Sequence, residues 1–589
     1  MNTRRLIAVL LVIMLAIPGL ALGSFDLTSA DEQAEIKYNP GTYTATKPGH
    51  EGDVTVEVTF SDSKIETVKV TEHKETAGVA DPALDTIPAA IVEEQALVDV
   101  VASASFTSRA ILDAVSDCVV QAGADPALLV KKTDESEQAG ELVVKKAPAI
   151  VVGAGGAGLA AAVKLGELGT HCILIEKMPA VGGNTARSGA AYNAVDPELQ
   201  ERENIEDSIE LHIQQTYEGG DKLGDMSLIT VLCENALDSI HWLEGHGVEF
   251  QDKITAVIGA MYPRTHYPIN SIGSDFTIPL ERIAKEQFGQ EILVNTKATE
   301  LIVEEGRVIG VKAVDTTNGT PYEFYGENGV ILTTGGFGAD IERCRSYNPN
   351  IPADIRTSNQ PGATGEGIDM AVAIGAEAIG MEYIQMLPIV GNCVSTAIEN
   401  QIFVNVEGNR FVREDGRRDV MSNAVLEQTG GYMYMIADQK VADTSITGSN
   451  LEDMLEKGVI YRADTLEELA AQIGVDADNL VKTVAAFNER VEAGVPDEFG
   501  REVFDNKLDT APYWASAKQV PILHHTMGGL KIDTKCHVIN TDGEIIPGLF
   551  AAGEVTGGIH GANRLGGNAL ADIFVFGRIA AETLVESAK

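Results

Sequence analysis

The segment GIHGANRLGGNAL, residues 558–570, places one arginine, Arg564, among several glycines. Glycine lets the backbone come close to a ligand, and a guanidinium group held there can grip an anion through two parallel hydrogen bonds. Two adjacent histidines, His524 and His525, precede another glycine turn. Taken one by one, such histidines are equally typical of a hydrogen-bonded core, and the arginine of a surface ion pair. Together, these residue types suggest a site for an anionic ligand.

A second group of charged residues lies in VREDGRRDVMSNA, which contains Arg417 and Arg418. Arginine is a poor proton donor, because its pKa is about 12 or more. The neighbouring acids Glu414, Asp415 and Asp419 favour a salt-bridged loop when the segment is taken alone.

The elements that must position these residues begin near Ala149. The buried strand AIVV is followed by GAGGAG, an apolar helix, and the strand CILI, which ends at Glu176. Glycines at Gly153, Gly155 and Gly158 permit the tight turn, the helix N-terminus receives a pyrophosphate, and the acid can hold a ribose hydroxyl. This βαβ unit predicts dinucleotide binding.

Two glycine-rich segments, almost 400 residues apart, favour FAD over a nicotinamide as the dinucleotide. One follows the acid at Lys177–Ala194, and the other is LFAAGEVTGGIHGANRLGGNAL near the C-terminus. A ligand held by segments from both regions fits a permanently bound cofactor better than one that must leave in each cycle.

The N-terminal part predicts a leader and a small α+β domain. Arg4 and Arg5 precede an apolar run and the small-residue segment ALGS, which indicates a signal peptide over 1–23, cut after Gly23 or kept as an anchor. Val54, Val56, Val58 and Phe60 alternate on one face of a predicted β-hairpin. Helices are expected over about 82–94 and 105–121, and a polar linker ends near Ala147.

Composition excludes several function classes. The chain has 589 residues, 44% of them hydrophobic, and a net charge of −43, which argues against nucleic acid and anionic membrane surfaces as partners. Its six cysteines form no CxxC or CxxCH motif, so no metal site and no haem attachment are expected in this chain.

The motifs GAGGAG…IEK, GGNT, TTGGFG, GATGEG, GNRFVRE, HHTMGG, AAGEVTGG and NRLGGNALAD resemble the fumarate reductase flavoprotein family, in its flavocytochrome c and urocanate reductase branch. The resemblance implies an α/β fold in which a Rossmann-like FAD-binding domain is interrupted by an α+β clamp domain. The expected ranges are 36–122 for an FMN-binding domain, 123–147 for a linker, 148–381 and 526–589 for the FAD-binding domain, and 382–525 for the clamp.

The same resemblance implies roles for individual residues. Arg564 and His524 match the family's carboxylate-binding residues, with Gly567 offering a backbone amide, and Arg418 matches the arginine that donates the proton. Non-covalent FAD is expected to contact Gly153, Gly155, Ala157, Gly158, Glu176, Asn184, Thr185, Gly189, Ala190, Glu366, His525, Glu554, Ala569 and Leu570.

The N-terminal domain is similar to domains that carry one covalent FMN on a hydroxyl group. Their motif, D-x-x-S-G-A-T/S, stands here as DVVASAS, with Ser105 at the attachment position and Ser103 in place of the usual glycine. The residues alone favour a helix N-cap at this place. The resemblance implies a tethered FMN that replaces the haems of the flavocytochromes as the electron relay to FAD.

The chain departs from the family where a second carboxylate would bind. Leu387 stands at the position of the family's histidine, with Met386 before it, and Val394 and Ala397 stand where the family has Glu and Arg. Leaving a carboxylate unpaired there would be costly, so a monocarboxylate with an apolar far end, such as an aryl acrylate, is expected. Leu387 is equally well explained as a residue of the hydrophobic core with no role in specificity. The lost residues leave Ser395, Glu399 or water as candidates for the proton route to Arg418.

The sequence therefore predicts an exported enoate reductase, in the periplasm or at the outer face of the membrane. Its partners would be a small unsaturated carboxylic acid and a membrane or extracellular electron donor. Alternatives are a urocanate or fumarate reductase proper, a flavin dehydrogenase of the ketosteroid type, and a non-catalytic electron-transfer flavoprotein.

Overall fold

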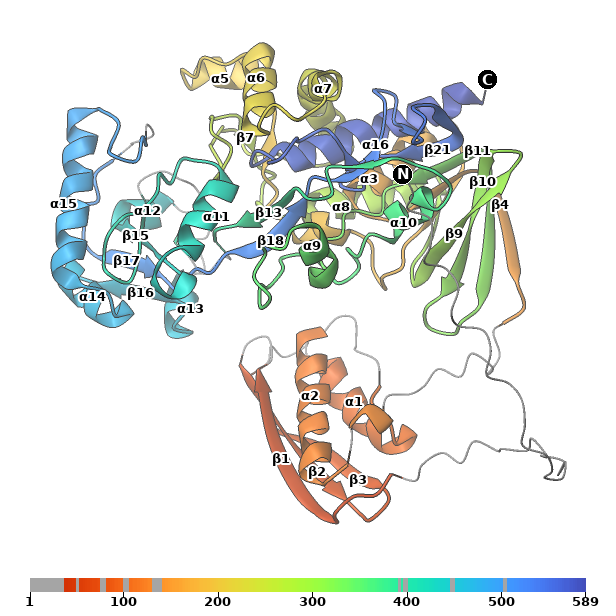
Figure 1. The fold of residues 1–589 in the computed structure, drawn as a ribbon, viewed down its shortest axis with the longest axis horizontal. Helices are drawn as coiled ribbons and strands as arrows, with labels where there is room; N and C mark the ends of the chain where they lie inside the picture. The colour runs from red at the N-terminus through yellow and green to blue at the C-terminus, as the bar shows by residue number, and fades with distance from the viewer. Residues whose placement is uncertain are drawn as a thin grey trace, which may run out of the picture. The chain divides into compact units, whose positions relative to one another are not determined.

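The computed structural model describes residues 36–48, 52–74, 81–98, 105–124, 126–129, 140–389, 394–395, 401–444, 451–501 and 506–588. The chain divides into two compact units, residues 1–134 and 135–589, which are described separately here (Figure 1). Within the described ranges, none of the helices combines the length and the apolar character needed to cross a membrane. The expected signal peptide and Cys393 lie outside these ranges.

The smaller unit is an antiparallel three-stranded sheet covered by two helices. Its strands are β1 (Gly41–Pro48), β2 (Asp53–Phe60) and β3 (Ile65–Glu72), in the order β1-β2-β3, and its helices are α1 (Asp81–Glu94), α2 (Ser105–Gln121) and the 3₁₀ turn η2 (Pro126–Leu129). The alternating side chains of β2 are buried against α1 and α2. The predicted hairpin and both predicted helices are thus confirmed, and β1 adds a strand to the prediction.

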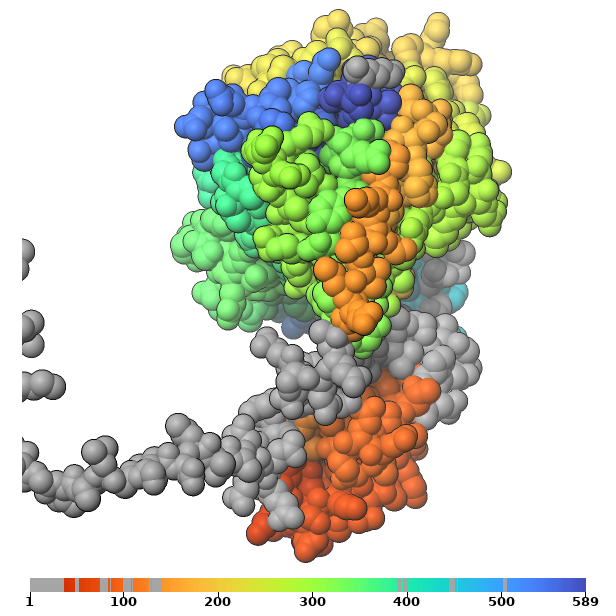
Figure 2. Space-filling view, turned by 90° about the vertical axis from the view of Figure 1, so that its right-hand side faces the viewer, coloured from red at the N-terminus to blue at the C-terminus, as the bar shows by residue number. Residues whose placement is uncertain are grey.

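The larger unit is built on an eight-stranded sheet. The strands β20, β21, β11, β4, β5 and β8 follow one another, and β10 and β9 continue antiparallel from β11. Their bounds are β4 (Val143–Val152), β5 (Cys172–Ile175), β8 (Glu291–Leu293), β9 (Thr296–Glu304), β10 (Arg307–Asp315), β11 (Pro321–Leu332), β20 (His537–Ile539) and β21 (Ile545–Ala551). Figure 2 shows the orange atoms of the first segment of this unit beside the green atoms of much later segments.

The strand β4 begins at Val143, inside the segment expected to be a linker. Its first half pairs in parallel with Tyr322–Gly326 of β11 but stays partly exposed. Because this half has no buried alternation, its sequence did not identify it as a strand. Only the second half, Ala149–Val152, carries the apolar run that predicted the βαβ unit.

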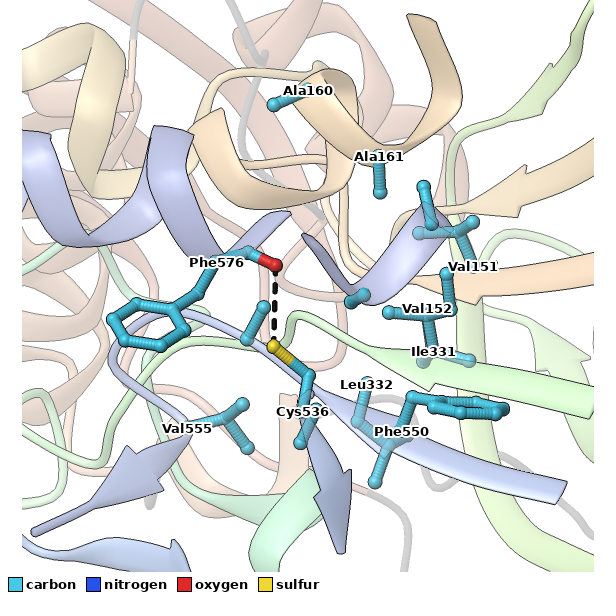
Figure 3. Close-up of a cluster of buried hydrophobic side chains, with 14 of the residues drawn as sticks. Val151, Val152, Ala160, Ala161, Ile331, Leu332, Cys536, Phe550, Val555 and Phe576 are labelled. Carbon is cyan, nitrogen blue, oxygen red and sulfur yellow. Dashed lines mark hydrogen bonds between the residues drawn. The ribbon is translucent and has the colours of Figure 1, made fainter. Parts of the chain in front are cut away.

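Two helices close the core over this sheet. The helix α3 (Gly156–Glu167) follows β4, and the C-terminal helix α16 (Asn568–Ser587) packs against it. The contact is close, since a Cβ at Gly577 would lie 2.6 Å from the carbonyl oxygen of Ala157. Figure 3 shows side chains of β4, β11 and β21 in one buried cluster with Ala160 and Ala161 of α3, and the thiol of Cys536 donates to the carbonyl of Phe576 at 3.5 Å.

Further elements surround the C-terminal ends of the parallel strands. They are α4 (Gly183–Arg187), β6 (Tyr192–Asn193), α5 (Pro197–Arg202), α6 (Ile209–Gly219), α7 (Met226–Gly245), β7 (Thr265–His266), α8 (Ser274–Arg282), the π-helical turn η3 (Ile283–Gln287), α9 (Ile341–Tyr347), α10 (Glu366–Val372), β12 (Ala378–Ile379), β19 (Gly529–Lys531) and β22 (Thr556–Gly557).

A second sheet with its own core is inserted before the last part of the chain. Its strand order is β14-β15-β17-β16, with β14 (Ile402–Val404), β15 (Tyr434–Asp438), β16 (Ile460–Ala463) and β17 (Tyr513–Ser516). The accompanying helices are α11 (Arg418–Leu426), the 3₁₀ turn η4 (Thr429–Gly431), α12 (Gln439–Thr444), α13 (Leu451–Glu456), α14 (Leu466–Ile473) and α15 (Ala477–Ala493). The inward faces of α14 and α15 form a separate cluster with this sheet.

Two antiparallel strands join the inserted part to the first sheet. They are β13 (Ile384–Leu387) and β18 (Ile522–Thr526), and α11 packs beside β13 (Figure 1). The predicted α/β fold, with an FAD-binding domain interrupted by an α+β insertion, is therefore confirmed.

Candidate active site

The dinucleotide turn leaves space at one of its three glycines. Gly153 has a φ of +100°, and a Cβ there would lie 2.5 Å from the carbonyl oxygen of Thr333. A Cβ at Gly158 would lie 1.9 Å from the carbonyl oxygen of Gly153, so both positions serve close packing. Gly155, the N-cap of α3, has nothing within 4 Å of its Cβ position. This open surface at a helix N-terminus fits a pyrophosphate.

Two acids lie in the cavity beyond this turn. Glu176 follows β5 and accepts hydrogen bonds from the backbone N–H groups of Ala154 at 2.8 Å and Met178 at 2.9 Å. Glu366 pairs with Lys177 at 2.8 Å. Burial opposes its ionisation, but hydrogen bonds from Lys177 and Thr364 lower the pKa of Glu366 to about 2. Both carboxylates line the first cavity.

A second cavity, of about 470 Å³, continues from the first. The two share the lining residues Asn184, Thr185, Glu554 and Ile573. The predicted residues that line one or both cavities are Gly153, Gly155, Ala157, Glu176, Asn184, Thr185, Gly189, Ala190, Glu366, Leu387, Arg418, His524, His525, Glu554, Arg564, Gly567, Ala569 and Leu570. Gly158 and Met386 do not line them. The two cavities form one continuous space whose lining residues fit FAD.

Arg418 is the first residue of α11, and its guanidinium lies inside the second cavity. The side chain is only 6% exposed, and its Nε donates to the carbonyl of Ile258 at 2.8 Å. Gly259 and Gly566 make room for this side chain. A Cβ at Gly259 would lie 2.6 Å from the Cγ of Arg418, and a Cβ at Gly566 would lie 2.9 Å from its Nη2. Burial and the neighbouring Arg564 lower the pKa of Arg418 well below its ordinary value.

The salt-bridged loop suggested by the sequence exists, but it does not include Arg418. Its members are paired as Arg410–Glu414, Arg501–Glu414, Arg413–Asp415 and Arg417–Asp419. Arg417 also pairs with Asp221, and the hydrogen bond to Asp221 is the main cause that raises the pKa of Arg417. Two consecutive arginines therefore have opposite environments: one is held by carboxylates and the other is buried without one among the described residues.

Arg564 lies in a turn that is held at its backbone. Gln385 donates to its carbonyl oxygen at 2.7 Å, and Asn193 donates to that of Gly566 at 2.7 Å. The side chain is 4% exposed, and no described residue is a hydrogen-bond partner for its Nε. Burial lowers the pKa of Arg564 to about 10, although Glu554 and Asp572 oppose the shift.

The turn ends at Gly567, which precedes α16 and requires glycine. Its φ is +91°, and a Cβ there would lie 2.1 Å from the Oδ1 of Asn193. The N-terminus of this 20-residue helix thus opens on the same cavity as both arginines. Its free N–H groups add positive potential to the site.

A β-bulge brings both histidines to the cavity. In the pairing of β13 with β18, Gln385 lies opposite His525 and Met386 opposite Leu523, so His524 is the extra residue. Neighbouring residues of a regular strand point to opposite faces, and the bulge removes that separation. His524 and His525 both line the second cavity.

Each histidine is oriented by a polar partner. The Nδ1 of His524 lies 2.8 Å from the hydroxyl oxygen of Ser358, and the Nδ1 of His525 lies 3.5 Å from Glu554. Burial first, and then Arg564, lower the pKa of both histidines well below the ordinary value. Neutral imidazoles are therefore expected near pH 7, able to donate one hydrogen bond each from the protonated nitrogen.

Part of the lining of the second cavity is apolar. Leu387 lines it, whereas Met386, on the opposite side of β13, is buried elsewhere. The apolar lining residues there are Val257, Ile258, Leu387, Ile389 and Ile522. Tyr267 also lines the cavity and acts electrostatically on Arg418.

Several lining residues were missed from the sequence. Ser358 and Tyr267 lie in loops without a motif, and only the fold brings them to the cavity. Ile389 lies two residues beyond Leu387, so alternation along β13 was a usable signal. Of the residues considered for the proton route, Ser395 is buried but does not line the cavity, and Glu399 lies outside the described ranges, as does Ala397.

The expected FMN attachment falls at the edge of what the structure describes. Ser105 is the first residue of α2, but the preceding residues 99–104 are outside the described ranges. Attachment at this residue stays a prediction. Within the described residues no cluster of acids, histidines and cysteines is arranged to hold a metal ion.

Comparison with known proteins matches both halves of the chain. A family model described as FAD binding domain matches residues 149–570, and one described as FMN-binding domain matches residues 49–120. The chain is 40% identical to the NADH:acrylate oxidoreductase of Vibrio harveyi over 94% of its own length, and it spans 62% of that protein. It is 37% identical to the urocanate reductase of Eggerthella lenta over 91% of each chain. The solved open conformation of a flavocytochrome c3 fumarate reductase is similar with a TM-score of 0.61 and 36% identity, covering 75% of this chain and 79% of that one.

Proposed function

The chain belongs to the fumarate reductase flavoprotein family of FAD-dependent oxidoreductases, with an additional FMN-binding domain, and from this premise we propose that it reduces the C=C bond of an α,β-unsaturated carboxylate. The FAD-binding part carries the site, and the FMN-binding domain relays electrons to it. Acrylate, urocanate and fumarate reductases among its relatives support this class of reaction.

One observation carries the proposal. Arg418 and Arg564 are both buried in one cavity, and neither forms an ion pair with a carboxylate in the described part of the chain. Glu554 and Asp572 attract Arg564 without pairing with it. Two neighbouring buried cations with no carboxylate in direct contact are costly. A bound anion compensates them, so an acid is a better substrate for this cavity than a neutral alcohol or ketone.

The roles of the residues follow from their surroundings. Arg564 and a His524 that donates from Nε2 hold the carboxylate of the substrate. Negative charge that builds on this carboxylate during the reaction is stabilised by the same donors. The hydride comes from reduced FAD when the cofactor is bound. Arg418 delivers a proton to the alkene carbon that does not accept the hydride, from the face of the substrate opposite the flavin. The burial that lowers the pKa of Arg418 makes it a better acid than an exposed arginine.

The apolar part of the lining supports a monocarboxylate as the substrate. Leu387, Ile389 and Ile522 offer no partner for a second carboxylate, and an unpaired carboxylate would be penalised there. An aryl acrylate places its carboxylate at the arginines and its ring against these residues. Urocanate, with a polar ring, and fumarate, with a second acid, are the competing substrates in the test below.

Electron supply and location complete the proposal. One FMN, bound covalently at Ser105, relays electrons to the non-covalent FAD from a membrane or extracellular donor. The protein is exported, and the tethered flavin then cannot diffuse away. The apolar N-terminal segment supports this location.

A screen of unsaturated acids tests the proposal directly. Holoprotein is mixed with chemically reduced methyl viologen, and dye oxidation is followed after addition of acrylate, cinnamate, urocanate, fumarate or no acid. Cinnamate or acrylate is expected to accelerate oxidation more than fumarate does. If no acid accelerates it while alcohols or ketosteroids are oxidised with an added electron acceptor, the protein is a dehydrogenase and the proposal is wrong. If neither occurs, a non-catalytic electron-transfer role is indicated.

A further inference from the structure

Arg417 connects the inserted part of the larger unit to the FAD-binding part. Its guanidinium binds Asp221 through Nη1 and, at 3.0 Å, through Nη2. It also binds Asp419, the second residue of α11, at 2.6 Å. Asp221 lies just after α6, in the FAD-binding part. The contact therefore joins residues that are 196 positions apart.

The Asp221 end of this contact is tied to the segment that carries Arg564. Asn563 donates to the carbonyl of Gly219 at 3.0 Å, and the N–H of Ala562 donates to the carbonyl of Gly220 at 3.0 Å. The two segments are in close contact, because a Cβ at Gly220 would lie 2.4 Å from the carbonyl oxygen of His560. The turn with Asp221 thus cannot shift without the turn that leads into Arg564.

The other end is next to the proposed acid. Arg417 is the N-cap residue of α11 and Arg418 is the first residue of that helix. The position of Arg417 therefore determines where the helix begins and from which point Arg418 extends into the cavity. The ion pair thus links the residue before Arg418 to Asp221, whose preceding residues Gly219 and Gly220 bind the segment that leads into Arg564.

We infer that Arg417 and Asp221 are positioning residues, whose ion pair sets the placement of Arg418 relative to Arg564 around the bound carboxylate. This inference rests on the proposed function. The ion pair opposes the mutual repulsion of the two buried guanidinium groups, which would otherwise favour moving α11 away from the Arg564 turn. A bound anion and the ion pair therefore both hold α11 close to the Arg564 turn.

The ion pair is partly exposed, so its contribution to activity can be tested by varying the salt concentration. The side chains are 18% exposed at Arg417 and 49% exposed at Asp221. Exposed ion pairs are screened by dissolved ions, and the screening length falls from about 20 Å at low salt to a few ångströms near 1 M. A positioning effect carried by this pair must weaken over that range.

The test compares two substitutions that remove a partner of the same arginine. Asp221→Asn removes the distant partner and keeps a residue type that tolerates the φ of +57° found there. Asp419→Asn removes the local partner and leaves the distant one. Steady-state constants are measured for the fastest of acrylate, cinnamate, urocanate and fumarate in the viologen assay, at about 20 mM and about 0.5 M salt.

Asp221→Asn is expected to lower kcat/KM by about three-fold at low salt, and the ratio of wild type to variant should approach one at high salt. Asp419→Asn should stay closer to the wild type at both salt concentrations. In a double-mutant cycle, Asp221→Asn should add nothing to Arg417→Gln. FAD content, measured as the non-covalent flavin released on denaturation, shows that each variant has folded.

Three results would overturn the inference. They are a salt-independent loss in Asp221→Asn, an equal loss in Asp419→Asn, and additive losses in the cycle. A wild type that reduces none of the four acids would instead refute the proposed function, so the two failures are distinguishable.

Discussion

The Nδ1 of His524 lies 2.8 Å from the hydroxyl oxygen of Ser358, at a position where the hydroxyl can fix the imidazole tautomer. The hydroxyl has two acceptors within reach, this Nδ1 at 2.8 Å and the carbonyl of Leu523 at 3.3 Å. When it donates to the nearer Nδ1, the single proton of the neutral ring stays on Nε2. That proton is the one needed to donate a hydrogen bond to a carboxylate. Ser358 thus connects a loop without a motif to the proposed substrate contact.

Ser358→Ala should raise KM for the substrate acid by about five-fold, which corresponds to about 1 kcal/mol for one lost hydrogen bond. Ser358→Thr keeps a hydroxyl and should restore most of the affinity. Ser346→Ala, which removes an exposed hydroxyl bonded to the carbonyl of Arg343, is the matched control. Equal KM values for Ser358→Ala and the wild type would rule out this role.

Arg418→Ala should reduce kcat by roughly 10²- to 10⁴-fold, the range for loss of a general acid, while FAD stays bound. The measurement is viologen oxidation at saturating acid, with the flavin spectrum as the check on the fold. Arg413→Ala, which removes a partly exposed arginine paired with Asp415, should keep nearly full activity. Full turnover in Arg418→Ala would refute its role as proton donor.

Leu387→His should increase kcat/KM for fumarate by roughly ten-fold, because the new histidine can pair with the second carboxylate. A stabilisation of about 1.4 kcal/mol from this pairing corresponds to that factor. Met386→His is the control, because Met386 is adjacent but does not line the cavity. The ratio of fumarate to cinnamate rates is the readout. An unchanged ratio in Leu387→His would mean that the second carboxylate does not bind at this part of the cavity.

Ser105→Ala should remove FMN from the denatured protein, whereas Ser103→Ala should retain it. Intact-mass measurement after denaturation detects the covalent flavin directly. Non-covalent FAD is released in both variants and serves as an internal standard. Flavin that remains attached in Ser105→Ala would place the attachment at another residue.

The alkaline limb of the pH profile should lie at or below about pH 10. Burial lowers the pKa of Arg564 to about 10 and shifts that of Arg418 in the same direction. Both groups act as cations, so kcat/KM is retained below the pKa and lost as the pH rises through it. A profile of kcat/KM between about pH 7 and 11 reports the free enzyme. A flat profile to about pH 11, with the protein still folded, would contradict the buried environment of the two arginines.

Local patterns were sufficient to predict the FAD-binding core. The strand Ala149–Val152, the glycines after it and the strand ending at Glu176 follow rules that act over a few residues, and the structure has all of them. The hairpin of the smaller unit was predictable for the same reason. The first half of β4 was not, because its residues are exposed and only its pairing with β11 makes it a strand.

The candidate site was predicted where motifs carry it and missed where only the fold does. Arg564 and His524 lie in glycine-rich segments of a known pattern. Ser358 reaches His524 from a loop 166 residues earlier, a distance along the chain at which no local rule applies. The family resemblance selected Arg418 over the adjacent Arg417, and Arg418 is the one that lines the cavity. The residue types alone could not make this distinction, because it depends on the distant residues Asp221 and Ile258.

The strand β21 lies beside β11 in the centre of the first sheet, and the helix that follows it supplies one wall of the cofactor cavity. Because β21 is the last strand of that sheet along the chain, Ile545–Ala551 must be synthesised before the sheet can be completed. A chain cut short before this point has an unpaired sheet edge and lacks the arginine turn altogether. A chain that terminates upstream therefore lacks both a strand of the sheet and part of the cavity lining.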